Sequence, residues 1–88
     1  MEKTEQISIE KIDEKYMKKT VMVVGLVERV VQTGGPTVFG LVDGTGNLSL
    51  KGFISPGERA FPDIEAGDYV EVVALVADEL GVVLLWVF

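Results

Sequence analysis

The 88-residue sequence contains no cysteine and no histidine. A disulfide, a thiolate nucleophile, a Ser-His-Asp triad and an ordinary zinc site are therefore all excluded. Carboxylates remain as candidate catalytic groups, but the close pairs Asp63 with Glu65 and Asp78 with Glu79 fall in predicted turns, where charged side chains are normally solvated. We expect no catalytic activity, no metal and no other cofactor in this chain.

Long apolar runs are missing as well. The longest, Val82 to Phe88, is far shorter than the about 20 residues of a membrane-spanning helix. The N-terminal stretch Met1 to Gln6 is charged and lacks the apolar core of a secretory signal. Together with the lack of cysteine, these features predict a cytoplasmic protein with no membrane partner.

Positive charge is scarce. The chain has 8 lysines and arginines against 14 acidic residues, which gives a net charge of −6. This excess opposes tight binding to nucleic acid, because lysine and arginine supply most of the affinity for phosphates. A binding surface would need a local charge that differs from the average.

Apolar residues, in contrast, make up 48% of the chain, which is enough for the core of one small domain. We divide the chain into an N-terminal segment, residues 1–19, and a β domain, residues 20–88. In the first part Ile9, Ile12 and Tyr16 follow helical spacing, with Ser8 as a candidate N-cap, which predicts a short amphipathic helix. We expect this helix to close one end of its own domain; a partner-binding helix is the alternative.

The β domain has five segments with the composition of strands. They are Thr20–Gln32, Thr37–Val42, a strand that begins at Asn47, Tyr69–Ala77 and Val82–Phe88. Gly25 predicts a bend or bulge in the long first strand. Turns are predicted at 33–36, 43–46 and 78–81, and residues 55–68 form a loop with at most one helical turn. The pattern predicts an all-β, five-stranded Greek-key barrel of the OB-fold type, with a short N-terminal helix.

Several motifs resemble the core signature of OB-fold nucleic-acid-binding domains. They are Val21-x-Val23-x-Gly25-x-Val27, Phe39-x-Leu41-x-Asp43-x-Thr45-Gly46 and Gly67-Asp68-x-Val70. More narrowly, the stretches Gln32–Phe39 and Gly57–Ile64 resemble the OB module of archaeal RecJ-like exonucleases of the DHH family. In that family a separate domain with Asp and His ligands carries the nuclease chemistry. The resemblance therefore implies an accessory domain of such a nuclease, or of another DNA replication or repair protein, either excised from a longer chain or free-standing. The apolar end Leu84–Phe88, without a polar tail, fits a chain that continues in a longer protein.

OB domains stack bases on aromatic side chains across two central strands, while cations follow the phosphates. The candidate nucleic-acid-binding residues are Arg29 in the first strand, Lys51 and Phe53 on the outer face of the third, and Arg59 and Phe61 in the loop that follows. Each also has a structural interpretation, because phenylalanines can cap the barrel and cations can simply be solvated. We assign three other aromatic residues to the core or the barrel rim, namely Phe39, Tyr69 and Trp86.

One or two stacking contacts, each worth about 1–3 kcal/mol, and about three cations predict weak binding on the micromolar scale. The predicted ligand is single-stranded DNA, with RNA not excluded. The alternative is a protein-interaction OB domain that does not contact nucleic acid. The acidic net charge favours it, as do Val38 and Val42, which we expect to be exposed on the same face. Other domains of a parent nuclease are the partners that the resemblance implies.

Overall fold

The structure is a computed structural model that describes residues 4–55, 57–77 and 81–88. Its strands are β1 (Glu5–Gln6), β2 (Thr20–Gln32), β3 (Thr37–Val42), β4 (Asn47–Gly52), β5 (Tyr69–Ala77) and β6 (Gly81–Val87). The bounds of β2, β3 and β5 are those predicted from the sequence. The predicted turn after β5 falls mostly on residues 78–80, which lie outside the described residues.

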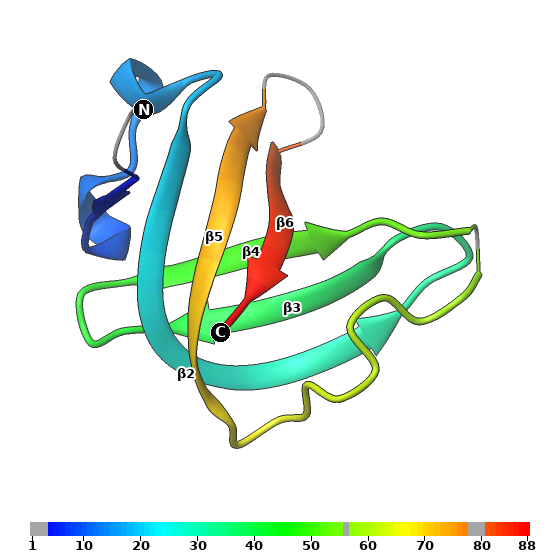
Figure 1. Ribbon diagram of the computed structural model, residues 1–88. Helices are drawn as coiled ribbons and strands as arrows, with labels where there is room; N and C mark the ends of the chain where they lie inside the picture. The colour runs from blue at the N-terminus through cyan, green and yellow to red at the C-terminus, as the bar shows by residue number, and fades with distance from the viewer. Residues whose placement is uncertain (1–3, 56, 78–80) are drawn as a thin grey trace.

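Strands β2 to β6 form a closed barrel (Figure 1). β2 pairs antiparallel with β3, β3 with β4 and β5 with β6, whereas β4 and β6 run parallel. The ring closes because β2 also pairs antiparallel with β5. This circular order, β2-β3-β4-β6-β5-β2, fits the five-stranded Greek-key barrel of the OB type and confirms the predicted all-β fold.

The long strand β2 belongs to both halves of the barrel. From its start to Leu26 it pairs with β5, and from Leu26 onward it pairs with β3; Figure 1 shows its ribbon curving between the two. Gly25 permits the bend, because a β-carbon there would lie 2.5 Å from the backbone oxygen of Val42. The bulge itself falls at Glu28, between Val27 and Arg29, and not at Gly25.

The core consists of side chains that alternate along the strands, as the period of two requires. Those less than 2% exposed include Val21, Val23, Val27, Phe39, Leu41, Leu50 and Val72. Burying one valine or leucine contributes about 1.5–3 kcal/mol, so this interior is the main source of stability. Ile9 from the N-terminal segment and Ile64 from the loop before β5 join the same cluster.

The N-terminal segment contains two separate 3-10 turns, η1 (Ile9–Lys11) and η2 (Glu14–Tyr16), so the predicted amphipathic helix was wrong. Ser8 precedes η1 but its side chain makes no capping hydrogen bond. The helix is divided because the backbone is extended at Ile12 and Asp13, between the two turns, and the Asp13 carboxylate starts η2 anew by accepting the N–H of Lys15 at 3.1 Å. The apolar residues of the segment still pack against the core. No helix of the described residues is long and apolar enough to cross a membrane.

Candidate nucleic-acid interface

The outer face of β2, β3 and β4 carries two of the three cations that the sequence singled out, Arg29 and Lys51. Cross-strand pairs place Arg29 beside Gly40 and Gly40 beside Ser49, and the neighbouring outward row pairs Val38 with Lys51. Directly paired residues of neighbouring strands share one face of a sheet. Arg29 and Lys51 therefore lie on the same outer face of the barrel, two strands apart.

The side chain of Arg29 lies across the backbone of β3. A β-carbon at Gly40 would come within 3.0 Å of Arg29 Cγ and 3.4 Å of its Nε. Arg29, Gly40 and Ser49 help to line a shallow hollow of about 140 Å³. Its other lining residues are Glu28, Leu41, Val42, Asn47 and Leu48. Glu28 brings a carboxylate to the rim, so the hollow is not purely cationic.

Lys51 and Phe53 lie outside this hollow. Lys51 is half-buried, and its ammonium lies 3.9 Å from the place that a β-carbon of Gly81 would take, so it leans toward the start of β6. Phe53 comes directly after β4 and is 46% exposed. The face thus offers two cations at separate places and one exposed ring at the end of β4, and these three side chains do not gather in one hollow.

Arg59 and Phe61 hold the loop between β4 and β5. The guanidinium of Arg59 donates a hydrogen bond to the carbonyl oxygen of Ile64, in the same loop. Phe61 has a φ of 50° and packs its ring edge-on against Phe39, with 6.2 Å between the ring centroids. Both residues therefore have a structural role, and neither lies on the outer face of β3 and β4.

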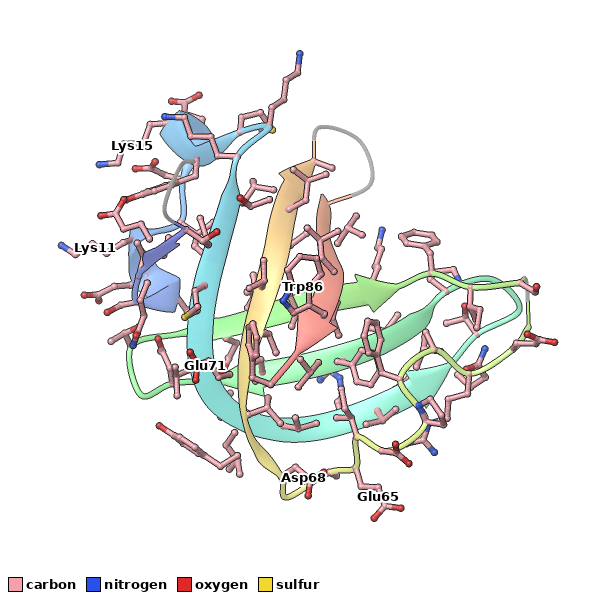
Figure 2. All side chains as sticks on the ribbon, viewed as in Figure 1. Lys11, Lys15, Glu65, Asp68, Glu71 and Trp86 are labelled. Atoms are coloured by element: carbon pink, nitrogen blue, oxygen red, sulfur yellow. The ribbon has the colours of Figure 1, made fainter. Side chains whose placement is uncertain are left out.

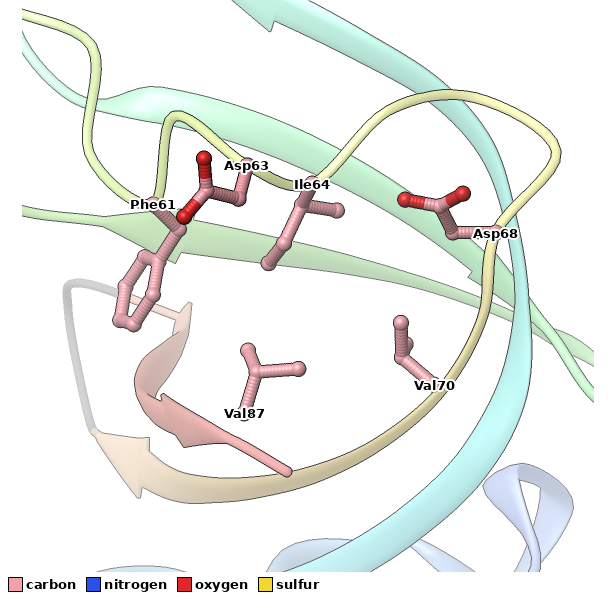
Figure 3. A pocket seen from close by; sticks show the side chains of 6 residues that line it. All are labelled: Phe61, Asp63, Ile64, Asp68, Val70 and Val87. Carbon is pink, nitrogen blue, oxygen red and sulfur yellow. The ribbon is translucent and has the colours of Figure 1, made fainter.

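A second hollow, of about 310 Å³, lies between this loop and the adjoining parts of β5 and β6 (Figure 3). Its lining residues are Phe61, Asp63, Ile64, Asp68, Val70 and Val87. Asp68 Oδ2 accepts a hydrogen bond from the N–H of Glu65 at 2.9 Å, which shapes the turn. Two carboxylates above apolar walls repel phosphate, so this hollow does not extend the candidate interface.

Of the aromatic residues assigned to the core or rim, only Phe39 is buried, at 1% exposed. Tyr69 is 72% exposed and Trp86 is 53% exposed, which the sequence reasoning missed. The alternation of side chains along β5 could have indicated that Tyr69 faces outward, because the next residue, Val70, faces the core. The sequence contains no comparable indication for Trp86. Alternation from the buried Leu84 would place Trp86 inside, but the β5–β6 pairing shifts by one residue between Val73 and Ala74, so Trp86 points outward.

The carboxylate of Asp43 serves the fold. Its Oδ2 accepts the N–H of Ile9 at 2.8 Å, and its Oδ1 accepts the N–H of Thr45 at 2.9 Å and the Thr45 hydroxyl at 2.6 Å. Burial raises the pKa of Asp43, but hydrogen bonds from Thr45, Ile9 and Gly46 lower it by more, so the pKa lies below its ordinary value of 3.8. Within residues 4–55, 57–77 and 81–88, no three acidic side chains gather in a way that could hold a metal ion.

Comparison with known proteins gives one informative similarity. An uncharacterized protein of Methanocaldococcus jannaschii is 44% identical to this chain over 52 residues, which cover 59% of the chain and 7% of that protein. No family model matches the sequence. The chain therefore spans only a small part of the length of the relative that it matches.

Proposed function

We propose that the chain binds single-stranded nucleic acid, DNA in the first place, over the outer face of β3 and β4. The observation that carries the proposal is the exposed guanidinium of Arg29 lying across Gly40, beside the small side chain of Ser49. A glycine in a strand lets another backbone approach closely. A phosphate can therefore reach the guanidinium without meeting a bulky side chain.

Two further residues extend this contact surface. Lys51 adds a second cation on the same face, and Phe53 offers an exposed ring to one base. One stacked base is worth about 1–3 kcal/mol. Glu28 and the net charge of −6 work against the phosphates, so the affinity is micromolar in scale and most evident at low salt.

In the cell this module would guide single strands to a cytoplasmic enzyme of DNA replication or repair. The resemblance to the OB module of archaeal RecJ-like exonucleases points to a nuclease as that enzyme. Two findings support an accessory role: the chain is an OB-type barrel, and its similarity lies within a much longer protein. Catalysis would then belong to another domain.

The test is fluorescence anisotropy of a labelled 12-nucleotide poly-dT strand at about 20 mM and about 200 mM salt. We expect micromolar binding that weakens with salt, with a log–log slope of about 0.7 for each cation engaged. Arg29→Gln or Lys51→Gln should each reduce the slope by about 0.7. Phe53→Ala should weaken binding by about five-fold or more without changing the slope.

Lys11→Gln is the matched control, because it removes the same charge from an exposed position on the N-terminal segment (Figure 2). It should change binding less than either variant on the β3–β4 face. The absence of binding at high micromolar protein in low salt would end the proposal. The same titration with poly-U separates DNA from RNA.

A protein-interaction domain is the second candidate. Val38 and Val42, which we expected to be exposed on the same face, are half-buried, so that part of the argument was wrong. Val31, Phe53 and Ile54 are exposed on or beside the proposed nucleic-acid face. A second set of exposed apolar side chains, on β2, β5 and the end of β6, lies away from that face: Leu26, Tyr69, Trp86 and Phe88.

A further inference from the structure

The outer side of the wall formed by β2, β5 and β6 is apolar and aromatic. Cross-strand pairing sets Leu26 beside Tyr69. The N–H of Phe88 donates to the carbonyl of Glu71 at 2.9 Å, which continues the β5–β6 ladder and places these two residues side by side. Trp86, two residues before Phe88, points to the same side. We call this surface the aromatic wall; its residues are Leu26, Tyr69, Glu71, Trp86 and Phe88.

The apolar members of the aromatic wall are open to solvent. Tyr69 is 72% exposed, Phe88 69%, Trp86 53% and Leu26 40%. Isolated exposed apolar residues are common, but several on adjoining strands mark an interaction site. Tyrosine, tryptophan and phenylalanine are also the residues most enriched at protein interfaces.

Glu71 lies in the middle of this surface and is half-buried. Val24 and Phe88 flank it across the strands, and Tyr69 and Val73 flank it along β5. Figure 2 shows Glu71 and Trp86 against the same wall of the barrel. Within the described part of the chain, no hydrogen bond or ion pair occupies the Glu71 carboxylate. A partly desolvated carboxylate in apolar surroundings gains most from a cation brought by a partner.

We propose that the aromatic wall docks a partner protein through an apolar segment that brings an arginine or lysine to Glu71. Nucleic acid fits this surface poorly, because Glu71 repels phosphates and none of its outward neighbours is a cation. A second copy also fits poorly, because a two-fold contact centred here would bury two Glu71 carboxylates together. The inference does not rest on the proposed function, which uses the outer face of β3 and β4.

The test begins with selection of displayed random 12-residue peptides on the immobilised 88-residue chain. Selected peptides should combine apolar residues with a central arginine or lysine. Their synthetic, dye-labelled forms are then titrated by anisotropy. Trp86 is the chain's single tryptophan, so a shift of its emission reports docking at this surface.

Variants of the chain locate the contact. Tyr69→Ala, Phe88→Ala and Glu71→Gln should each weaken peptide binding by about ten-fold or more. Ile54→Ala is the control, because Ile54 is 59% exposed but lies outside the aromatic wall, and it should leave the affinity unchanged. A peptide whose basic residue is replaced by glutamate should bind the Glu71→Lys variant more tightly than it binds the original chain. A purely structural role of Glu71 would not produce this exchange of preference.

Several results would overturn the inference. They are a selection that enriches no peptide over background, enriched peptides without a basic residue, and affinities that the three variants leave unchanged. A dimer in sedimentation that Trp86→Ala dissociates would assign the surface to a second copy, and quenching of Trp86 by poly-dT would assign it to nucleic acid. The three variants should bind poly-dT as the original chain does, so failure here is distinct from failure of the proposed function.

Discussion

The side chain of Arg29 is held over the backbone of Gly40, where an added β-carbon would come within 3.0 Å of Arg29 Cγ. The guanidinium can take this direction only because Gly40, in the neighbouring strand, has no side chain. The neighbour that a β-carbon would meet is a flexible, exposed side chain, so the arginine can move aside without any shift of the strands.

Gly40→Ala separates binding from folding. We expect the free energy of unfolding to change by less than about 1 kcal/mol, because Arg29 can swing away and alanine restricts the unfolded chain. Binding to poly-dT should fall about as much as in Arg29→Gln, because the guanidinium leaves its position beside Ser49. Urea unfolding and anisotropy measure the two effects, and unchanged affinity would show that this orientation of Arg29 has no role in binding.

Gly25→Ala should instead damage the barrel. A β-carbon there would lie 2.5 Å from the backbone oxygen of Val42, and that strand cannot retreat without breaking its pairing with Leu26. We expect a loss of about 2–3 kcal/mol in the free energy of unfolding, in the range of overpacked cores. Gly34→Ala is the control, since a β-carbon there meets nothing within 4 Å. Equal urea midpoints for the two variants would contradict this account of the bend in β2.

Much of the barrel was predictable because its strands are rich in β-branched residues and its turns contain glycine. Asp43 illustrates this: it opens the turn predicted at 43–46, and its side chain accepts the N–H of Thr45. The N-terminal helix was not predictable from spacing alone. Its apolar residues do pack against the core, but the extended backbone at Ile12 and Asp13 divides the segment into two short turns.

The surfaces were harder to predict than the strands. Arg29 and Gly40 are brought together by strand pairing after the bulge at Glu28, and a sequence does not show where a bulge falls. The same holds for Trp86, which an irregular register in β6 turns outward. Each such shift adds one residue to a strand and moves the side chains that follow to the opposite face. A single extra residue therefore decides whether an aromatic side chain lies in the core or on the surface.

Thr37→Val tests how the loop before β5 is attached. Thr37 is fully buried; its hydroxyl donates to Gln32 Oε1 at 2.7 Å and accepts the N–H of Ala60 at 2.9 Å. Valine keeps the shape but leaves the buried Ala60 N–H without an acceptor, which costs about 1–3 kcal/mol. Thr37→Ser keeps the hydroxyl and should lose less. Urea unfolding gives the comparison, and a serine variant as unstable as the valine variant would assign the effect to packing.

Asp43 should make the stability of the fold depend on pH in the acid range. Because its pKa is lowered in the folded state from the ordinary 3.8, its contribution is fully present above that value and is lost as the pH falls through the folded pKa. Asp43→Asn presents an amide where Ile9 needs an acceptor, so at pH 7 it should lose about 1 kcal/mol, as for a lost capping side chain. Urea unfolding from pH 7 to pH 3 should show the two proteins converging below about pH 4, since protonation removes the same interaction from the original chain. A constant difference across that range would mean that the charge of Asp43 does not hold the N-terminal segment to the turn between β3 and β4.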